Sequence, residues 1–337
     1  MRKEDAGMIV VTGGAGFIGS AFVWKLNSEG IEDIVVVDRL GTSDKWKNLV
    51  NRRFVEYIHK DDFLKMIYAD QVPFTVRAIV HMGACSSTTE KDADYLWTNN
   101  YLYSCRLADW AIRNGIRFLY ASSAATYGDG SLGFSDDDET TALLRPINMY
   151  GYSKQVFDLW ALKRGADQHM AGLKFFNVFG PNEYHKGDMT SVVFKAFHQI
   201  RATGKVRLFK SYRPEYPDGG QMRDFVYVKD CAEAMWWLLN HREANGIFNL
   251  GSGKARTWND LMAAVFRSMD RHPAIDYIDM PPGLDEQYQY FTEAKTERLA
   301  GTGCPVPSTS LEDAVQDYVA NHLAQRDPHL GMCCAIQ

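Results

Sequence analysis

Tyr150 and Lys154 stand four residues apart in the segment Tyr-Gly-Tyr-Ser-Lys. On a helix, this spacing places both side chains on one face. A lysine ammonium beside a phenol lowers the pKa of the phenol, which gives a general base able to work near neutral pH. Tyr152 is a competing phenol, but Val156 follows it at the same spacing, so we expect Tyr152 to serve in packing. A tyrosine and a lysine at this spacing also occur by chance on exposed helix faces. The position of the pair in the fold therefore determines whether it can be catalytic.

Two serines close a strand predicted over residues 118–122. In a doubly wound sheet, ligands bind at the carboxyl ends of the strands. The hydroxyl group of Ser123 is therefore placed to hold a substrate alcohol against the Tyr150 phenol. Ser123, Tyr150 and Lys154 together form a candidate catalytic set.

Three glycines, Gly13, Gly16 and Gly19, follow a β-branched run over residues 8–12 and open a stretch of helical periodicity. Glycines at these positions allow a tight turn, a close approach of the backbone to a pyrophosphate, and close packing of helix on sheet. The start of the helix adds free N–H groups and a favourable dipole. This pattern predicts a dinucleotide site.

Asp38 closes the next strand, nineteen residues beyond Gly19. A carboxylate there can accept a hydrogen bond from the adenosine ribose, which suggests NAD. Arg39 follows directly and Lys45 is nearby, and their cationic groups suit the 2′-phosphate of NADP. We expect NADP, with NAD as the alternative in which Arg39 is only a solvated loop charge.

These residues need a scaffold of alternating strands and helices, and the sequence predicts one. Apolar runs at 8–12, 34–37, 78–81, 118–122 and 173–178 alternate with helical stretches at 95–114 and 151–164. This alternation is typical of an α/β protein with a Rossmann-type, doubly wound parallel sheet. Beyond Gly180 the pattern loosens into a helix at 192–203 and a polar excursion at 211–221, before strand character resumes at 225–228 and 247–250. We therefore expect a dinucleotide-binding Rossmann domain (8–177 and 225–258) interleaved with a smaller C-terminal substrate domain (178–224 and 259–330).

Composition narrows the class of protein. The chain has 337 residues, of which 46% are hydrophobic, and its net charge of −5 gives no attraction to nucleic acid or to an anionic membrane. No apolar run reaches the roughly 18 residues that cross a bilayer, so we expect a cytoplasmic protein. Its six cysteines, which include the adjacent Cys333 and Cys334, lack the paired spacing of a zinc site. We expect reduced thiols and no metal.

The glycine motif, the strand-end serine and the Tyr-x-x-x-Lys segment together resemble the extended short-chain dehydrogenase/reductases. In that superfamily the three elements carry the chemistry, which would make Ser123, Tyr150 and Lys154 the catalytic triad. Longer segments resemble the ADP-L-glycero-D-manno-heptose 6-epimerase family over about residues 8–325. These segments are Gly-Ala-Cys-Ser-Ser-Thr-Thr-Glu (83–90), Tyr-Ala-Ser-Ser-Ala-Ala-Thr-Tyr-Gly (120–128), Asn-Val-Phe-Gly-Pro (177–181), His-Lys-Gly (185–187) and Arg-Asp-Phe-Val-Tyr-Val (223–228).

The family resemblance implies an activity. Its members invert C6″ of ADP-heptose through a transient ketone, for the inner core of bacterial lipopolysaccharide. It also implies one tightly bound NADP per subunit and a homo-oligomer, commonly a pentamer. The lysine of the His-Lys-Gly segment, Lys186, becomes a second acid/base, although its local sequence alone suggests a solvated loop lysine. Two bases suit an inversion because the hydroxyl must be deprotonated on either face.

The resemblance further implies two sets of binding residues. Those expected at the cofactor are Gly13, Gly16, Phe17, Ile18, Gly19, Asp38, Arg39, Lys45, Lys60, Met82, Gly83, Ala84, Cys85, Ser86, Asn99, Lys154 and Val178. Those expected at the nucleotide sugar are Ser123, Asn177, Asp188, Lys195, Phe209, Ser211, Arg223 and Tyr288. Asp188 and Lys195 depart from the serine and histidine usual in the family, and the segment 212–221, beside Ser211, is longer than in its shortest members.

Three alternatives stay open from the residues alone. A UDP-hexose 4-epimerase shares the same triad. Only the segments that resemble the heptose epimerase family distinguish that alternative from a 6-epimerase. A nucleotide-sugar 4,6-dehydratase needs an acid pair after the strand-end serine, where Ala124 and Ala125 stand. A non-catalytic dinucleotide-binding protein would typically lose the triad.

Overall fold

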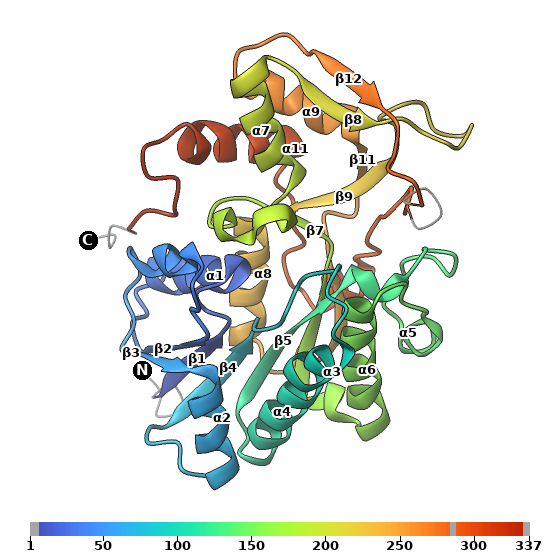
Figure 1. Ribbon diagram of the computed structural model, residues 1–337. Coiled ribbons are helices and arrows are strands. Elements are labelled where there is room, and N and C mark those ends of the chain that lie inside the picture. The colour runs from blue at the N-terminus through green and yellow to red at the C-terminus, as the bar shows by residue number, and fades with distance from the viewer. Residues whose placement is uncertain (1–6, 284–287, 333–337) are drawn as a thin grey trace.

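Seven parallel strands form the central sheet in the computed structural model, which describes residues 7–283 and 288–332. Cys333 and Cys334 lie outside these residues. The sheet lies in the lower half of Figure 1, where β3, β2, β1, β4 and β5 are labelled. Its full strand order is β3-β2-β1-β4-β5-β6-β10. This order confirms the doubly wound fold, because the direction of strand succession reverses between β1 and β4. The strands are β1 (Met8–Thr12), β2 (Ile34–Asp38), β3 (Glu56–His59), β4 (Val76–His81), β5 (Arg117–Ser123), β6 (Met170–Phe175) and β10 (Gly246–Leu250).

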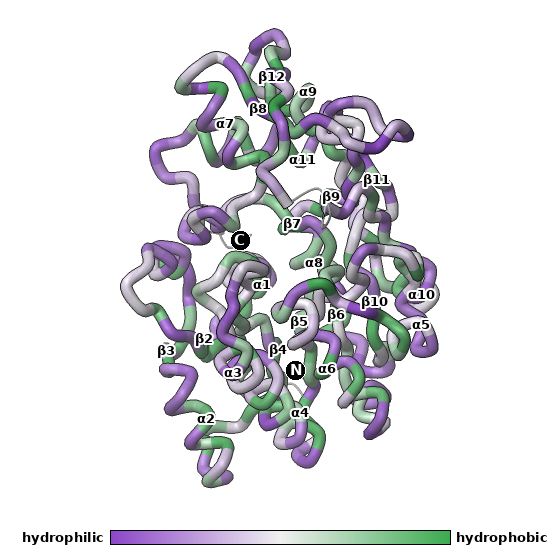
Figure 2. The backbone as a smooth tube through the Cα atoms, turned by 45° about the vertical axis from the view of Figure 1, so that its right-hand side comes forward, coloured by the Kyte–Doolittle hydropathy of each residue, from purple (hydrophilic) through white to green (hydrophobic). Residues whose placement is uncertain are grey.

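Helices cover both faces of this sheet, which explains the continuous apolar runs of its inner strands. All five residues of β2 and of β10 are buried. Figure 2 shows hydrophobic stretches concentrated on the central strands, with more hydrophilic outer loops. Helices α1 (Phe17–Ser28) and α8 (Val228–Asn240) pack on one face, and α2 (Lys60–Ala69), α4 (Tyr103–Arg113) and α6 (Met149–Arg164) on the other.

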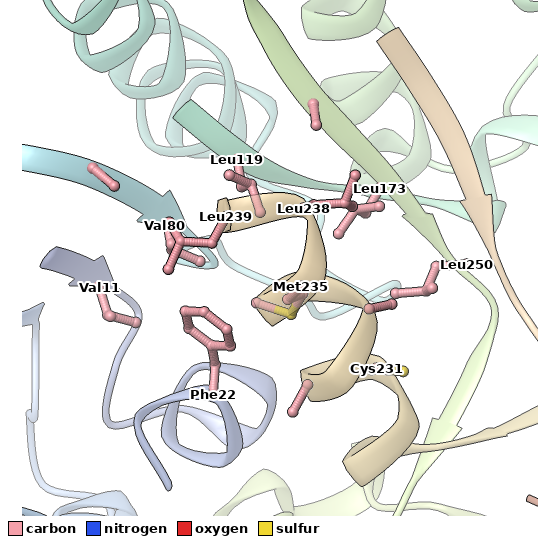
Figure 3. Packing of buried hydrophobic residues seen from close by; sticks show 14 of the residues in the cluster. Val11, Phe22, Val80, Leu119, Leu173, Cys231, Met235, Leu238, Leu239 and Leu250 are labelled. Carbon is pink, nitrogen blue, oxygen red and sulfur yellow. The ribbon is translucent and has the colours of Figure 1, made fainter. Parts of the chain in front are cut away.

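Helix α8 supplies much of the core on the first face. In Figure 3 its Met235 and Leu238 lie over the strands, with Phe22 of α1 beside them. Leu119 on β5 and Leu173 on β6 complete this cluster from the sheet side. The C-terminal half of the chain therefore stabilises a sheet that the N-terminal half begins.

A second layer lies above the carboxyl ends of the central strands (Figure 1). It contains a three-stranded sheet of order β11-β9-β7 and a parallel pair of β12 with β8. A separate apolar cluster joins it to the N-terminal turn of α1. Its elements are β7 (Asn177–Phe179), β8 (Val206–Phe209), β9 (Met222–Tyr227), β11 (Ala255–Thr257), β12 (Ile275–Ile278), α7 (Val192–Thr203), α9 (Trp258–Ser268) and α11 (Leu311–Tyr318).

Two expected strands differ from those observed. The run predicted at 173–178 is two strands, because the chain leaves the central sheet at Phe176 and β7 pairs with β9 instead. The run predicted at 225–228 ends at Tyr227, and it lies in the three-stranded sheet rather than the central one. Pairing between segments far apart in sequence decided both cases. The boundaries of the two interleaved domains stay a prediction.

The helix expected at 95–114 is continuous but composite. It begins as α3 (Ala93–Leu96), passes through a π-helical stretch at Trp97–Leu102, and continues as α4. Two shorter helices, α5 (Asp138–Leu143) and α10 (Glu297–Gly301), complete the α-helices of the described residues. None of the helices in this part of the chain is both long and apolar enough to cross a membrane. No group of three or more possible metal ligands occurs in the same residues.

Candidate active site and cofactor pocket

The glycine turn between β1 and α1 leaves a helix start open to a ligand. Gly16 is the N-cap of α1, and no side chain accepts a hydrogen bond from the first turn. A Cβ atom on Gly19 would lie 2.1 Å from the carbonyl oxygen of Gly13, so the turn closes only with glycine there. Free N–H groups at an uncapped helix start suit a pyrophosphate. The residues present therefore fit the dinucleotide expected from the sequence.

A pocket of about 120 Å³ lies beside this turn, at the ends of β1, β2 and β4. Asp38 is held there from both sides, since Oδ2 accepts a hydrogen bond from Ala15 N at 2.9 Å and Oδ1 accepts one from Lys45 Nζ at 2.6 Å. Arg39 and Lys60 also line the pocket, so cationic side chains outnumber the single carboxylate. The other lining residues are the expected Gly13, Gly83, Ala84, Cys85 and Asn99, and the unexpected Thr12, Val37, Tyr95 and Tyr103.

A buried polar chain supports this pocket from behind. His81 Nδ1 lies 2.6 Å from Thr12 Oγ1, and His81 Nε2 lies 2.8 Å from Ser104 Oγ. Burial lowers the pKa of His81 to about 3, so the imidazole is neutral and bridges the two hydroxyl groups. Asn100 fixes the next segment, because its side chain bonds both the N–H and the carbonyl group of Cys85. Sequence reasoning missed His81 and Asn100 because their roles depend on contacts between β4 and the helix that follows it.

The candidate triad meets at the carboxyl end of β5. Ser123 is the last residue of that strand, and Tyr150 and Lys154 lie in the first turns of α6, which Asn148 caps. Lys154 is buried and donates a hydrogen bond from Nζ to the carbonyl oxygen of Ala121 at 2.8 Å. Its burial lowers the pKa of Lys154 to about 8. The helix and the strand thus bring the three side chains together as expected.

The expected effect of Lys154 on the phenol is wrong for the chain alone. Burial raises the pKa of Tyr150, and a hydrogen bond with Ser123 opposes this only in part. Desolvation outweighs the hydrogen bond because a phenolate loses more hydration than a phenol. The expected packing role of Tyr152 is also wrong, since 46% of that residue is exposed to solvent. Its position two residues along α6 turns it away from the face of Tyr150.

A cavity of about 360 Å³ adjoins the triad. Its lining includes Ser123 and Tyr150 together with five residues expected from the sequence at the cofactor or sugar: Phe17, Ile18, Ser86, Asn177 and Val178. Lys186, the expected second acid/base, also lines this cavity. The residues that sequence reasoning missed are Thr88, Phe175, Phe176, Phe179, Met189, Thr190, Ser191, Val192, Val193, Phe225, Trp258 and Leu261. Most of these are apolar and carried no signal beyond a buried strand or helix.

Lys186 is a mostly buried cavity residue rather than a solvated lysine. Its Nζ lies 5.1 Å from the centre of the Phe17 ring. Burial lowers the pKa of Lys186, while the Glu183 carboxylate opposes that shift. The following residue, Gly187, has a φ of 55°, in the left-handed region that favours glycine. The His-Lys-Gly sequence therefore folds as a short helical segment that turns sharply after its lysine.

Arg223 is a buried cation held by aromatic rings. Its guanidinium carbon lies 5.6 Å from the ring of Trp258 and 5.3 Å from the ring of Tyr288. Nη1 donates to the backbone carbonyl of Met222 at 2.8 Å. Trp258 lines the cavity, so Arg223 contacts a cavity residue without lining the cavity itself. A planar guanidinium in such a place suits a diphosphate group.

Six expected sugar-binding residues do not line the cavity: Asp188, Lys195, Phe209, Ser211, Arg223 and Tyr288. Asp188 and Lys195 are exposed, and Lys195 Nζ donates to the backbone carbonyl of Asp188 at 2.6 Å. Phe209 ends β8, and Ser211 N donates to Asp218 Oδ1 at 2.8 Å. Their roles stay predictions. Gly16, Gly19, Met82 and Lys154 lie outside both lining sets and belong to the elements that shape them.

A buried ion pair supports the end of β5 from below. Lys174 Nζ lies 2.7 Å from Asp158 Oδ2, and both side chains are fully buried. Asp158 also accepts a hydrogen bond from Ser122 Oγ at 2.7 Å. Lys174 donates to Thr126 Oγ1, which in turn donates to the carbonyl oxygen of Ser123. This network joins β5, β6 and α6 around Ser123, the candidate catalytic serine.

Comparisons with known proteins identify the family of this chain. The chain is 64% identical over 323 residues to ADP-L-glycero-D-manno-heptose-6-epimerase of Nitratidesulfovibrio vulgaris strain Hildenborough, covering 96% of this chain and 100% of the relative. It is 48% identical over 332 residues to the protein of the same name from Fusobacterium nucleatum subsp. nucleatum, with 96% and 100% covered. The chain belongs to the ADP-L-glycero-D-manno-heptose-6-epimerase family. Because an epimerase is an isomerase, the chain is an isomerase.

Two further comparisons extend this assignment. Residues 9–251 of this heptose epimerase match the NAD dependent epimerase/dehydratase family, so its cofactor is a nicotinamide dinucleotide. Its fold is similar to the crystal structure of the Helicobacter pylori ADP-L-glycero-D-manno-heptose-6-epimerase. The TM-score is 0.79 at 26% identity, over 95% of this chain and 98% of that one. The resemblance seen in the sequence segments is thereby confirmed.

Proposed function

We propose that this heptose epimerase interconverts ADP-D-glycero-D-manno-heptose and ADP-L-glycero-D-manno-heptose by inverting C6″. The observation that carries the proposal is that Ser123, Tyr150 and Lys186 line one cavity. They come from three separate elements: a strand end, a helix start and a loop. Two groups able to move a proton, beside a hydroxyl group that can hold the sugar alcohol, are what an inversion at a secondary alcohol needs.

A nicotinamide dinucleotide, held by the glycine turn and the Asp38 pocket, would supply reversible hydride transfer at C6″, so that the sugar could pass through a flat ketone. The side chains of this protein handle the proton of the sugar hydroxyl. One of Tyr150 and Lys186 takes that proton as the alcohol becomes a ketone. The other gives a proton to the carbonyl oxygen as the alcohol re-forms with inverted configuration. Ser123 hydrogen-bonds the oxygen throughout, and no net reductant is consumed.

Burial favours the uncharged forms of both acid/base groups, because it raises the pKa of Tyr150 and lowers that of Lys186. An uncharged phenol can give a proton, and an uncharged amine can take one. In the reverse reaction the two groups exchange roles.

The nicotinamide dinucleotide is NADP in this proposal. Arg39, Lys45 and Lys60 line the pocket at the end of β2. The charge of Asp38 is already offset by Lys45 at 2.6 Å. Arg39 and Lys60 then supply the positive charge that a 2′-phosphate requires.

The ADP portion of the substrate is bound by Arg223 and Tyr288. Arg223 has no carboxylate among the contacts described above, so its charge is available to the diphosphate. Asn177 lines the same cavity as Ser123 and Tyr150, where the heptose would lie. We also propose that the enzyme works in the cytoplasm as a homo-oligomer, in keeping with the family resemblance.

The test is to incubate the purified protein with each ADP-heptose epimer in turn and to follow the product by NMR. Either epimer should give the same equilibrium mixture, without added reductant. The dinucleotide released from the denatured protein should be NADP. Inertness toward both ADP-heptoses, with turnover of a UDP-hexose, would replace this proposal by the 4-epimerase alternative.

A further inference from the structure

Glu183 is a fully buried carboxylate three residues before Lys186, and its exposed fraction is 0%. Its Oε1 accepts hydrogen bonds from Ser191 Oγ at 2.6 Å and from Tyr318 OH at 2.9 Å. Its Oε2 accepts one from the backbone N–H of Ser191 at 2.5 Å. A carboxylate withdrawn from water in this way costs free energy unless its neighbours compensate, so its retention needs a reason.

These contacts clamp the segment that carries Lys186. The side chain of Glu183 reaches Ser191, which caps helix α7. The backbone carbonyl of Glu183 also accepts the hydrogen bond from Lys186 N at 3.0 Å. One residue therefore fixes both ends of residues 184–190, and Tyr318 ties this clamp to helix α11.

The same segment is also anchored to the cofactor side of the site. Asn182, which precedes Glu183, is fully buried and donates from Nδ2 to Ser20 Oγ at 2.9 Å. Asn48 Nδ2 donates to the carbonyl oxygens of both Ala15 and Asn182 at 3.0 Å. The start of the segment is thus placed relative to the glycine turn, and Glu183 places the rest.

The Lys186 ammonium itself is held only loosely. Its contact is the Phe17 ring, and the carboxylate of Glu183 is the nearby charge that favours its protonated form. Lys195 acts in the opposite direction. The placement of Lys186 at the cavity therefore depends on the fold of its backbone segment.

We propose that Glu183 is a positioning residue that holds Lys186 at the reaction cavity, so that the chemistry on one face of the sugar depends on Glu183. This inference rests on the proposed function. Ser123, Tyr150 and Lys154 lie on β5 and α6, and none of the Glu183 contacts reaches those elements. Loss of the clamp should therefore affect only the half of the reaction that uses Lys186.

The experiment measures single-turnover oxidation of each ADP-heptose epimer by the holoenzyme, from the absorbance of the reduced nicotinamide. Lys186→Met first identifies the epimer whose oxidation uses Lys186. Glu183→Gln, which keeps the volume and most hydrogen bonds but removes the charge, should slow oxidation of that same epimer by about tenfold or more. Oxidation of the other epimer should keep its wild-type rate.

Two further variants keep the result interpretable. Tyr318→Phe retains the Glu183 carboxylate but removes one of its hydrogen bonds, and should slow oxidation of the same epimer by a smaller factor. This variant tests the role of Glu183 if Glu183→Gln fails to fold. Asp136→Asn alters another buried carboxylate, one that accepts from Asn249 N away from the cavity, and should leave the ratio of the two rates unchanged. If Glu183→Gln slows the oxidation of both epimers equally, or of neither, the proposed role of Glu183 is wrong while the proposed function stands. A wild-type protein inert toward both epimers would overturn the proposed function with it.

Discussion

Lys154 donates its hydrogen bond to the carbonyl oxygen of Ala121 at 2.8 Å, two residues before Ser123 on the same strand. The lysine thus joins helix α6 to strand β5, and its contact in the chain alone is the strand rather than the Tyr150 oxygen. Because the pKa of Lys154 is lowered to about 8 by burial, its charge is sensitive to whatever binds nearby.

The first prediction concerns the phenol. Tyr150→Phe keeps the ring and removes the oxygen that moves the proton, so epimerisation should fall by at least about 10²-fold, the usual scale for a positioned acid/base. Binding of the dinucleotide should survive. Tyr152→Phe is the matched control, because Tyr152 is exposed on the same helix and its loss should leave the rate unchanged. Near-normal turnover by Tyr150→Phe would remove this residue from the mechanism.

A second prediction addresses the choice of cofactor. Arg39→Ala should weaken NADP by about 1.5–3 kcal/mol, the value of a hydrogen bond to a charged group, and weaken NAD much less. Preference should then move toward NAD, as measured by titration calorimetry on protein stripped of its dinucleotide. Lys47→Ala is the control, since Lys47 pairs with Asp44 outside the pocket. Equal losses for NADP and NAD would make Arg39 a bystander.

The route of the hydrogen atom gives a third prediction. If Tyr150 and Lys186 move only the hydroxyl proton, turnover in D₂O should leave every carbon-bound position of the product unlabelled. Mass spectrometry of the product after many turnovers measures this directly. A dehydratase, or an epimerase that deprotonates carbon next to a ketone, must exchange a carbon-bound hydrogen with solvent. Deuterium at carbon would therefore contradict the proposed chemistry, whatever the sequence similarity.

The fourth prediction is a dependence of stability on pH. The pKa of His81 is about 3 in the folded protein, against 6.5 for a free histidine side chain, so between these limits the unfolded chain binds more protons. The free energy of unfolding should consequently fall as pH drops through this window, by up to about 1.4 kcal/mol per unit from this group. Urea unfolding at several pH values measures the slope.

His81→Gln should flatten that slope, because glutamine does not titrate, although its stability at neutral pH should be lower for want of the Thr12 and Ser104 contacts. His272→Gln, at an exposed position, should leave the slope as it is. If the pH dependence of the unfolding free energy is unchanged in His81→Gln, groups other than His81 cause the loss of stability at low pH.

Local patterns predicted the parts of the site that local physics controls. The glycine turn, Asp38 at the end of β2, and the Tyr150–Lys154 spacing each depend on one strand or one helix and the residues next to it. Lys186 was different, because its burial depends on Phe17 from another helix, and the sequence alone suggested a solvated loop. Only the family resemblance pointed to its place at the cavity.

Other features could not be predicted, because they depend on desolvation or on distant pairing. The direction of the Tyr150 pKa is set by burial, which a sequence does not display. The break at Phe176 reflects pairing of β7 with β9, about forty residues later in the chain. Glu183 gave no signal either, since a single acid in a loop usually faces solvent.

The edge position of β10 has a consequence for the chain while it is still being made. Strand β10 pairs with β6, and Arg117 of β5 donates to the carbonyl oxygens of Leu238 and Ala244. On the ribosome, every segment of the glycine turn and the triad therefore emerges before the strand that covers the β6 edge. A chain truncated before Gly246 would carry the complete nucleotide motif yet expose the unpaired edge of β6, a feature that leads nascent chains to associate. Completion of synthesis through Leu250 is thus the point at which the edge of β6 becomes paired.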